Sequence, residues 1–271
     1  MLKTRIKTAI VLVIIFIPIL WFSYNTYVVK GFEAVLSALA IWEMFRAGGI
    51  LKKLWLTIPF ELIACGLPFV TIPEYLMILT VIFPLALMMF LFIMLHINSE
   101  KVRNNIMPVV YGVIILVFCH SVSLLRAQSF GIAYFIAVII AAIGTDTAAY
   151  FVGSHLGKHK LAPDVSPHKS LEGSLGGIAA SALLMAVFGV VLQLCFKLQV
   201  NYTAAVLYAV AGSVVGQIGD LSMSTIKRIH GIKDYSNLLP GHGGILDRFD
   251  SVIFLVPYTL LFVLGVNGII I

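Results

Sequence analysis

The sequence predicts an all-α, polytopic membrane protein with about nine transmembrane helices. Of its 271 residues, 61% are hydrophobic and 11% are charged, whereas a soluble globular domain usually has about 25% charged residues. The apolar residues also form runs that suffice to cross a hydrocarbon core, which takes about 20 helical residues. Since no linker divides the chain, we expect one membrane domain over 1–271, with N-terminal helices in 1–106 and catalytic helices and loops in 107–271.

Charged residues, proline and glycine bound the apolar runs and define the expected helices in chain order. These helices are residues 7–24, 28–46, 53–72, 75–95, 107–125, 129–152, 173–195, 203–226 and 251–271. The first is expected to be a membrane helix rather than a cleaved signal peptide, because the bulky Trp21 and Phe22 stand where a cleavage site needs small residues.

The basic residues predict the orientation. With the N-terminus in the cytoplasm, all of the 18 lysines and arginines except Lys30, Arg126 and Lys197 fall in cytoplasmic segments. This is the asymmetry that the positive-inside rule describes, and an odd number of helices then places the C-terminus outside. We therefore expect the cytoplasmic membrane as the location, with an active site facing the cytoplasm. The basic residues are scattered between spans, so nucleic acid is not an expected partner.

Two longer polar segments, 153–172 and 227–250, both fall on the predicted cytoplasmic side. Just before the first lies Asp146, inside a predicted helix, where an ionised carboxylate is costly unless it is paired or hydrated. One interpretation is a functional carboxylate with a cationic partner. The alternative is a helix-packing residue bonded to a neighbouring serine or threonine.

Acidic residues flank the second segment. On the eighth predicted helix, Asp220, Ser224 and Lys227 share one face, and Asp247 and Asp250 share a face at the start of the ninth. Magnesium prefers carboxylate oxygens at a site that leaves room for substrate phosphates, so Asp220 and Asp247 are the predicted metal ligands. Acids in a first turn also offset the helix dipole. That alternative explains Asp250 but not Asp220, which lies inside a span.

A glycine-rich turn, Gly241 to Gly244, precedes the last predicted helix. Backbone N–H groups in such a turn can face an anion. Four basic residues near it could hold phosphates: Lys227, Arg228, Lys233 and Arg248. Phosphoryl and nucleotidyl transfer need mainly metal ions, cationic side chains and positioning. Acids, bases and a glycine turn in one short segment therefore favour that chemistry.

The same residues resemble a known signature. The pattern Ser224-x-x-Lys227-Arg228, Lys233-Asp234, Pro240-x-His242-Gly243-Gly244 and Asp247-Arg248-x-Asp250 resembles that of the phosphatidate cytidylyltransferases, also called CDP-diacylglycerol synthases. The upstream segments Asp146-x-x-Ala149-Tyr150 and Ser166-Pro167-x-Lys169-Ser170-x-Glu172-Gly173 are similar to that family as well. The resemblance covers roughly the C-terminal half of the chain; the first half resembles the family only as apolar helices.

The resemblance implies transfer of a cytidylyl group from CTP to phosphatidate in the bilayer, with CDP-diacylglycerol and pyrophosphate as products and Mg²⁺ as cofactor. It implies that Asp220 and Asp247 bind the metal and act in catalysis together with Lys227 and Arg248. The implied substrate-binding residues are Asp146, Lys169, Ser224, Arg228, Lys233, Asp234, His242, Gly243, Gly244 and Asp250. Many relatives have an acidic residue where this chain has Met223, so no role for that carboxylate is carried over.

Two other functions remain open from the sequence. An ion-coupled transporter would explain acids within spans, but it predicts a site near the bilayer midplane, whereas the charges here gather at one face. Another membrane lipid phosphotransferase is the second alternative, although the paired aspartate motifs of the CDP-alcohol phosphotransferases are not present. Gly173, Gly177 and Ser181 predict a close helix contact, either within one chain or between the two copies of a homodimer.

Overall fold

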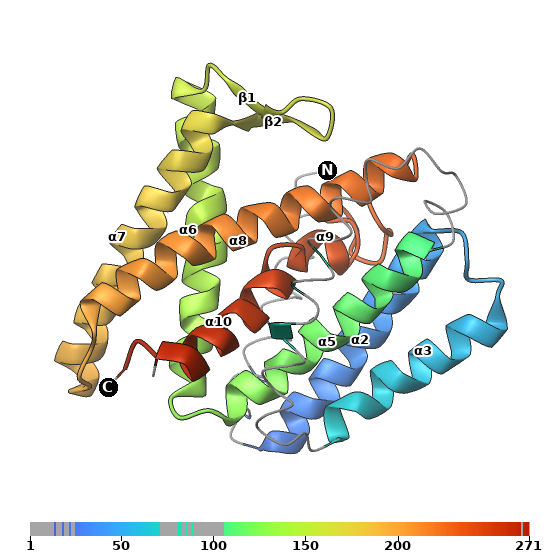
Figure 1. Cartoon of the computed structure of the whole chain (residues 1–271), viewed down its shortest axis with the longest axis horizontal. Coiled ribbons are helices and arrows are strands. Elements are labelled where there is room, and N and C mark those ends of the chain that lie inside the picture. Colours follow the sequence, from blue (N-terminus) through green and yellow to red (C-terminus); the bar gives the residue numbers. More distant parts are fainter. Residues whose placement is uncertain are drawn as a thin grey trace. The chain divides into compact units, whose positions relative to one another are not determined.

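The computed structural model describes residues 25–70, 106–266 and 268–270, together with the isolated residues 14, 18, 22, 81, 82, 85 and 88. The predicted helices over 7–24 and 75–95 therefore lie almost entirely outside the described residues. The described chain is mostly helical (Figure 1), as the composition predicts.

Four of the described helices are long and apolar enough to cross a membrane. They are α5 (Met107–Ala127), α6 (Gly131–Leu156), α7 (Leu171–Phe196) and α8 (Tyr202–Ile229). Large apolar side chains such as Leu183 and Leu194 of α7 are exposed, as expected for a helix whose solvent is lipid. These features confirm a helical membrane protein.

The chain divides into two compact units. The unit called here the loop unit comprises the described residues up to Ala127 and Ile226–Phe249; the pocket unit comprises Gln128–Thr225 and the described residues from Asp250 onward. Helix α8 contributes most of its length to the pocket unit and its last residues to the loop unit. The single domain expected from the sequence stays a prediction.

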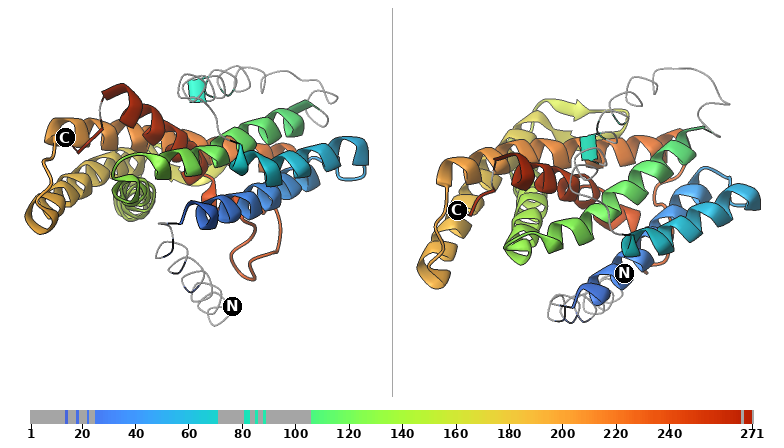
Figure 2. Two further views of the ribbon diagram at one scale, coloured as in Figure 1. Left: turned by 90° about the horizontal axis from the view of Figure 1, so that it is seen from below. Right: turned by 60° about the horizontal axis from the view of Figure 1, so that its bottom comes forward.

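In the loop unit, α2 (Thr26–Ala47) packs against both α3 (Leu54–Gly66) and α5, and the three helices run side by side in Figure 2. A 3-10 turn, η2 (Leu67–Phe69), follows α3. Asn25 caps α2, because its side-chain oxygen accepts a hydrogen bond from the Tyr27 N–H at 3.0 Å. These helices therefore form the scaffold for the loop that follows α8.

In the pocket unit, α6 and α7 lie side by side in close contact. A Cβ atom at Gly173 would stand 2.6 Å from the carbonyl oxygen of Ala149, and one at Gly177 would stand 2.8 Å from that of Thr145. Glycine at these positions lets the two backbones approach as membrane helices often do. The small-residue face of α7 is thus used within the chain, and the homodimer stays a prediction.

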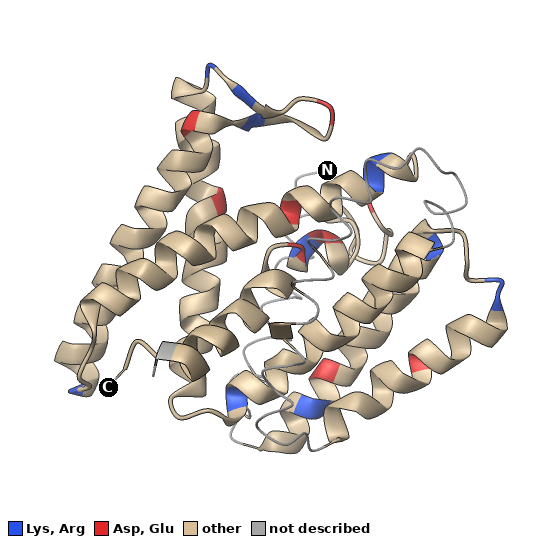
Figure 3. Ribbon diagram, in the orientation of Figure 1, with Lys and Arg blue, Asp and Glu red and all other residues tan. Residues whose placement is uncertain are grey.

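The segment between α6 and α7 forms a small hairpin that the sequence analysis did not predict. Strands β1 (Lys160–Ala162) and β2 (Ser166–Ser170) pair antiparallel, with Lys160 opposite Ser170 and Ala162 opposite Ser166. Lysines and acids gather on this hairpin and at the adjoining helix ends (Figure 3), whereas the rest of α7 carries no charge. The pocket unit therefore concentrates its polar chemistry at one end.

Two side chains at the start of α7 hold the hairpin in place. Glu172 accepts hydrogen bonds from the backbone N–H groups of Lys158 at 3.1 Å and His159 at 3.2 Å, and it pairs with the His159 ring at 2.6 Å. Ser170 caps α7 by accepting a hydrogen bond from the Gly173 N–H at 3.2 Å. These bonds position β2, and with it Lys169.

The last predicted helix differs from the structure. Asp247 lies in the short α9 (Leu246–Phe249), whereas Asp250 lies in the break before α10 (Val252–Val266). The expectation that both carboxylates share one helical face is therefore wrong. A physical reason is visible at the break, where the Asp250 side chain accepts a hydrogen bond from the Ser251 N–H at 2.9 Å. Aspartate side chains that bond to nearby backbone in this way compete with helical hydrogen bonds.

Candidate active site

The pocket unit encloses a pocket of about 300 Å³ at its charged end. Helices α6, α7 and α8 and the hairpin all contribute to its walls. The lining residues are Asp146, Ala149, Tyr150, Leu161, Ser166, His168, Lys169, Ser170, Gly173, Ser174, Gln217 and Asp220. Three of the residues predicted from the sequence, Asp146, Lys169 and Asp220, thus meet in one cavity.

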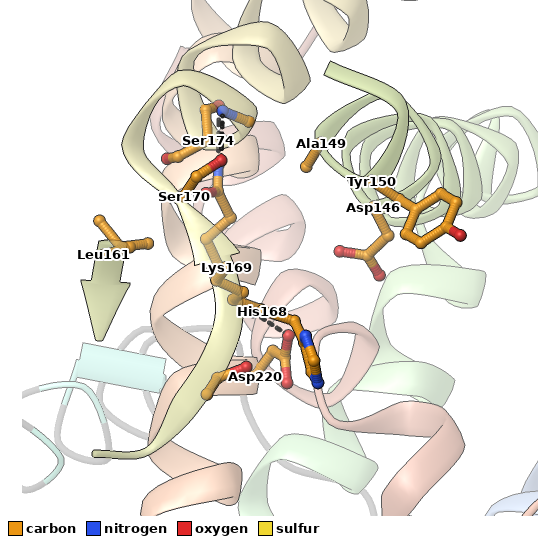
Figure 4. A pocket seen from close by; sticks show the side chains of 12 residues that line it. Asp146, Ala149, Tyr150, Leu161, His168, Lys169, Ser170, Ser174 and Asp220 are labelled. Carbon is orange, nitrogen blue, oxygen red and sulfur yellow. Dashed lines mark hydrogen bonds and ion pairs between the residues drawn. The ribbon is translucent and has the colours of Figure 1, made fainter. Parts of the chain in front are cut away.

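Lys169 of β2 and Asp220 of α8 form an ion pair inside this pocket (Figure 4). Their side chains are 28% and 19% exposed, so both are accessible from the pocket. One helical turn further along α8, the Ser224 hydroxyl donates a hydrogen bond to Asp220 at 3.3 Å. This contact confirms that Asp220 and Ser224 share a face of the helix.

Asp146 approaches the same ion pair from α6 (Figure 4). Its carboxyl interacts electrostatically with Asp220, which repels it, and with Lys169, which attracts it. Asp146 lines the pocket, but Lys169 forms its ion pair with Asp220, so both interpretations of Asp146 stay open. Two carboxylates with one lysine beside them form a set of hard oxygen donors that a divalent cation can use.

Several pocket residues were missed by the sequence analysis, among them Tyr150, His168, Ser174 and Gln217. The Gln217 amide donates hydrogen bonds to the Ser213 hydroxyl at 3.3 Å and the Ser174 carbonyl at 3.5 Å. A glutamine within an apolar helix was the signal that could have found it, because polar side chains in membrane spans are costly without a partner.

In the loop unit, Asp247 holds together the segment that follows α8. One of its oxygens accepts a hydrogen bond from the Lys227 ammonium at 2.7 Å. The other accepts hydrogen bonds from the N–H groups of Tyr235 at 2.8 Å and Gly244 at 2.9 Å. The Lys227 and Asp247 side chains are only 11% and 2% exposed. Asp247 therefore joins the end of α8, the loop and α9 from a buried position.

The glycine-rich turn requires glycine at two positions. Gly241 and Gly243 have φ angles of +80° and +83°, which lie in the left-handed region that other residues rarely adopt. A Cβ atom at Gly243 would also stand 2.8 Å from an Asp247 oxygen. The turn is closed by hydrogen bonds from the Leu239 N–H to the Gly243 carbonyl and from the His242 N–H to the Leu239 carbonyl, both at 2.8 Å.

The remaining predicted site residues of the loop unit line the loop and the nearby helix ends. Arg228, Lys233, Asp234 and Arg248 are exposed, and an Arg228 N–H donates to the Ile232 carbonyl at 3.2 Å. His242 is half-buried, and its Nδ1 atom has no hydrogen-bond partner among the described residues. Together these residues offer cationic and N–H donors around the turn.

One residue that contacts this loop was not predicted at all. Glu43 of α2 is fully buried, and its carboxylate accepts hydrogen bonds from the Ser236 hydroxyl at 2.5 Å, the Ile245 N–H at 2.8 Å and the Leu246 N–H at 2.7 Å. The sequence feature that could have identified Glu43 is an acidic residue inside an apolar helix, where an ionised side chain is costly without partners.

The predicted site residues thus fall into two groups. Asp146, Lys169, Asp220 and Ser224 lie close together in the pocket unit. Asp250 belongs to the same unit, where its side chain accepts a hydrogen bond from the Ser251 N–H. The others lie in the loop unit: Lys227, Arg228, Lys233, Asp234, His242, Gly243, Gly244, Asp247 and Arg248. Because Asp220 and Asp247 lie in different units, a metal ion shared between them stays a prediction.

Comparisons with known proteins identify the family to which this chain is similar. The model of the family described as "Cytidylyltransferase family" matches residues 3–265. A phosphatidate cytidylyltransferase of Staphylococcus epidermidis (strain RP62A) is 33% identical over 265 residues, which cover 94% of this chain and 96% of the relative. One from Staphylococcus aureus (strain COL) is 32% identical over 267 residues with the same coverage.

A third relative is more similar over a shorter region. The phosphatidate cytidylyltransferase of Bacillus subtilis (strain 168) is 42% identical over 141 residues, about half of each chain. The family match and the two nearly full-length alignments include both groups of site residues. This chain therefore belongs to the cytidylyltransferase family.

Proposed function

We propose that this chain is a phosphatidate cytidylyltransferase, which transfers a cytidylyl group from CTP to phosphatidate and so makes CDP-diacylglycerol for phospholipid biosynthesis. The observation that carries the proposal is the family match over residues 3–265, which spans both the pocket and the loop that Asp247 holds together. Membership of this family decides against the ion-coupled transporter and the other lipid phosphotransferases.

The proposed enzyme lies in the cytoplasmic membrane with its active site at the inner face. Four described helices long enough to span a bilayer support the membrane location. The excess of lysine and arginine in the predicted cytoplasmic segments supports an inside N-terminus and, with nine helices, an outside C-terminus. This orientation brings soluble CTP and the phosphatidate headgroup to the same interface.

Magnesium is the proposed cofactor, and the accessible Asp220 carboxylate fits it, whereas Asp247 would have to exchange its hydrogen bond from Lys227 for the ion. Within the described residues no three His, Cys, Asp or Glu side chains gather into a metal site of their own. Magnesium, however, is usually held by one or two carboxylates together with substrate phosphates. Asp220 and Asp247 would hold it, with Asp146 adding negative charge beside Asp220. When bound, the ion would neutralise charge on the CTP phosphates.

The proposed reaction requires the protein mainly to position the two substrates. An oxygen of the phosphatidate phosphate forms a bond to the α-phosphorus of CTP, and the bond from that phosphorus to the oxygen bridging the α- and β-phosphates breaks, so pyrophosphate leaves. The attacking phosphate oxygen is already ionised near neutral pH, and no general base is required. Lys169, Lys227, Arg228, Lys233 and Arg248 are proposed to hold phosphates, and His242 has a positional role.

The direct test is an assay of the purified protein with labelled CTP, phosphatidate and Mg²⁺. We expect CDP-diacylglycerol and pyrophosphate in equal amounts. Diacylglycerol in place of phosphatidate is the matched control, because it lacks the attacking phosphate and should give no product. Release of pyrophosphate without a labelled lipid, or labelled lipid from diacylglycerol, would contradict the proposal.

A further inference from the structure

We propose that Glu43 is a positioning residue for the reaction: its carboxylate sets the conformation of the turn that presents Asp247 and Arg248. The inference rests on the proposed function, since it assumes that this turn acts on CTP. Glu43 lies in α2, in the part of the chain where the sequence resembles the family only as apolar helices.

The hydrogen bonds around the turn carry the argument. Three consecutive backbone N–H groups precede Asp247, and each of them donates to a carboxylate. The Gly244 N–H donates to Asp247 itself at 2.9 Å, whereas those of Ile245 and Leu246 donate to Glu43 at 2.8 and 2.7 Å. Two acids from distant parts of the sequence thus determine the backbone that leads directly into Asp247 and Arg248.

Close packing restricts the conformation of Glu43 and of the turn. Glu43 and Leu246 are fully buried, and a Cβ atom at Gly244 would stand 2.4 Å from a Glu43 oxygen. The carboxylate therefore lies directly against the turn backbone. The Ser236 hydroxyl donates to the same oxygen as the Ile245 N–H, so Glu43 also ties the loop ahead of the turn to α2.

The chemistry of the donors explains why this position holds a carboxylate. All three groups that face Glu43 are donors, and an ionised carboxyl group accepts without donating. A glutamine of the same length would place an amide N–H against at least one of these donors. Burying an acid without such partners would cost several kcal/mol, so its presence in an apolar helix indicates a specific role.

The same helix supplies an internal control. Glu33 of α2 is equally buried, but the described partners of its carboxylate all belong to α5: the Ser123 hydroxyl, the Ser123 N–H at 3.1 Å and the His120 ring at 3.1 Å. Glu33 therefore joins two scaffold helices, whereas Glu43 joins α2 to the turn. Replacing each by glutamine makes the same chemical change at two places in one helix.

The experiment compares Glu43→Gln, Glu33→Gln and Asp247→Asn in the full-length protein. For Glu43→Gln we expect a KM for CTP raised at least about tenfold and a lowered kcat, because small misplacements of reacting groups cost up to about 100-fold. Amide hydrogen exchange should accelerate at Ile245 and Leu246. Glu33→Gln should keep the wild-type KM, since a purely structural defect reduces the amount of active enzyme and leaves KM unchanged.

Ser236→Ala keeps the test decisive if Glu43→Gln does not fold. It removes one donor to Glu43 and should raise the KM for CTP by a few fold. When both variants fold, their effects should be non-additive, as expected for residues in direct contact.

Three results would overturn the inference. One is a wild-type KM and wild-type exchange in Glu43→Gln, or in Ser236→Ala where Glu43→Gln does not fold. Another is an equal rise in KM in Glu33→Gln. In either case, an inactive Asp247→Asn leaves the proposed function standing. Full activity in Asp247→Asn would overturn both the role of the turn in the proposed function and the inference built on it.

Discussion

Among the described residues, each unit of this protein contains one lysine–aspartate ion pair, and the two pairs have different surroundings. Lys169 and Asp220 face a pocket from a hairpin strand and a helix, and both side chains remain accessible. Lys227 and Asp247 are buried, and the aspartate also accepts two backbone hydrogen bonds. The first pair can exchange partners with a ligand, whereas the second holds a loop in one conformation.

The difference follows from solvation. An accessible ion pair gains little over two hydrated ions, so its partners can be replaced by a cation or a phosphate at small cost. A buried ion pair has lost its water, and removing one member leaves an uncompensated charge. The pair in the pocket unit is therefore expected to exchange partners readily, whereas the pair in the loop unit adds a structural contribution to the binding roles proposed for Lys227 and Asp247.

The largest expected effect is that of Asp247→Asn. The substitution leaves the Lys227 ammonium buried without its counter-charge, which should lower the free energy of unfolding by about 3 kcal/mol. Activity should fall at least about 100-fold, because the variant loses a proposed metal ligand and weakens the bonds that hold the turn. Thermal unfolding in detergent and the CTP assay measure the two effects. An unchanged unfolding midpoint would contradict the structural contribution of Asp247.

Asp220→Asn should separate activity from stability. Because Asp220 is partly exposed, we expect a change in unfolding free energy below about 1 kcal/mol. Activity should still fall at least about 100-fold, because the variant loses a proposed metal ligand. A large loss of stability in the same measurements would show that this pair, too, is structural.

Asp146→Asn removes a carboxylate from the pocket, and we expect a smaller loss of activity than in Asp220→Asn. Chelation of Mg²⁺ should abolish activity in the wild type, and added Mg²⁺ should restore it. In the variant, the Mg²⁺ concentration for half-maximal activity should rise several-fold, since one of the two neighbouring negative charges is gone. Activity at saturating Mg²⁺ should stay near that of the wild type. An unchanged Mg²⁺ dependence would remove Asp146 from the cation site.

The smallest expected effect is the difference between alanine substitutions at two glycines of the loop unit. Gly231 and Gly243 both have positive φ angles, but a Cβ atom meets nothing within 4 Å at Gly231 and stands 2.8 Å from an Asp247 oxygen at Gly243. Gly231→Ala should cost about 1 kcal/mol, the penalty of the left-handed conformation. Gly243→Ala should cost more and raise the KM for CTP. Equal effects would show that the contact with Asp247 does not matter.

Much of the fold could be predicted because hydropathy is a local property. The apolar runs over 107–125, 129–152, 173–195 and 203–226 correspond to α5, α6, α7 and α8. The hairpin was missed because its strands have three and five residues, too few for a clear periodicity. The break between α9 and α10 was missed because the sequence does not show that the Asp250 side chain accepts a hydrogen bond from the Ser251 N–H.

The residue types of the candidate site could also be predicted, but their partners could not. Asp220 was singled out as an acid inside a span, yet its partner Lys169 lies 51 positions away in the sequence. Glu43 bonds to Ile245 across 202 positions. No spacing rule links residues so far apart, because their contact depends on how whole helices pack.

The sequence by itself determined that this chain is a helical membrane protein and indicated which residue types could carry its chemistry, because the bilayer selects for apolar runs and makes each buried charge conspicuous. Only the tertiary structure decided which lysine pairs with which aspartate. It also showed that Glu43 and Asp247 both accept hydrogen bonds from the N–H groups of one turn. The physical reason is that a buried ionised group must find its partners in three dimensions, and packing chooses among the candidates.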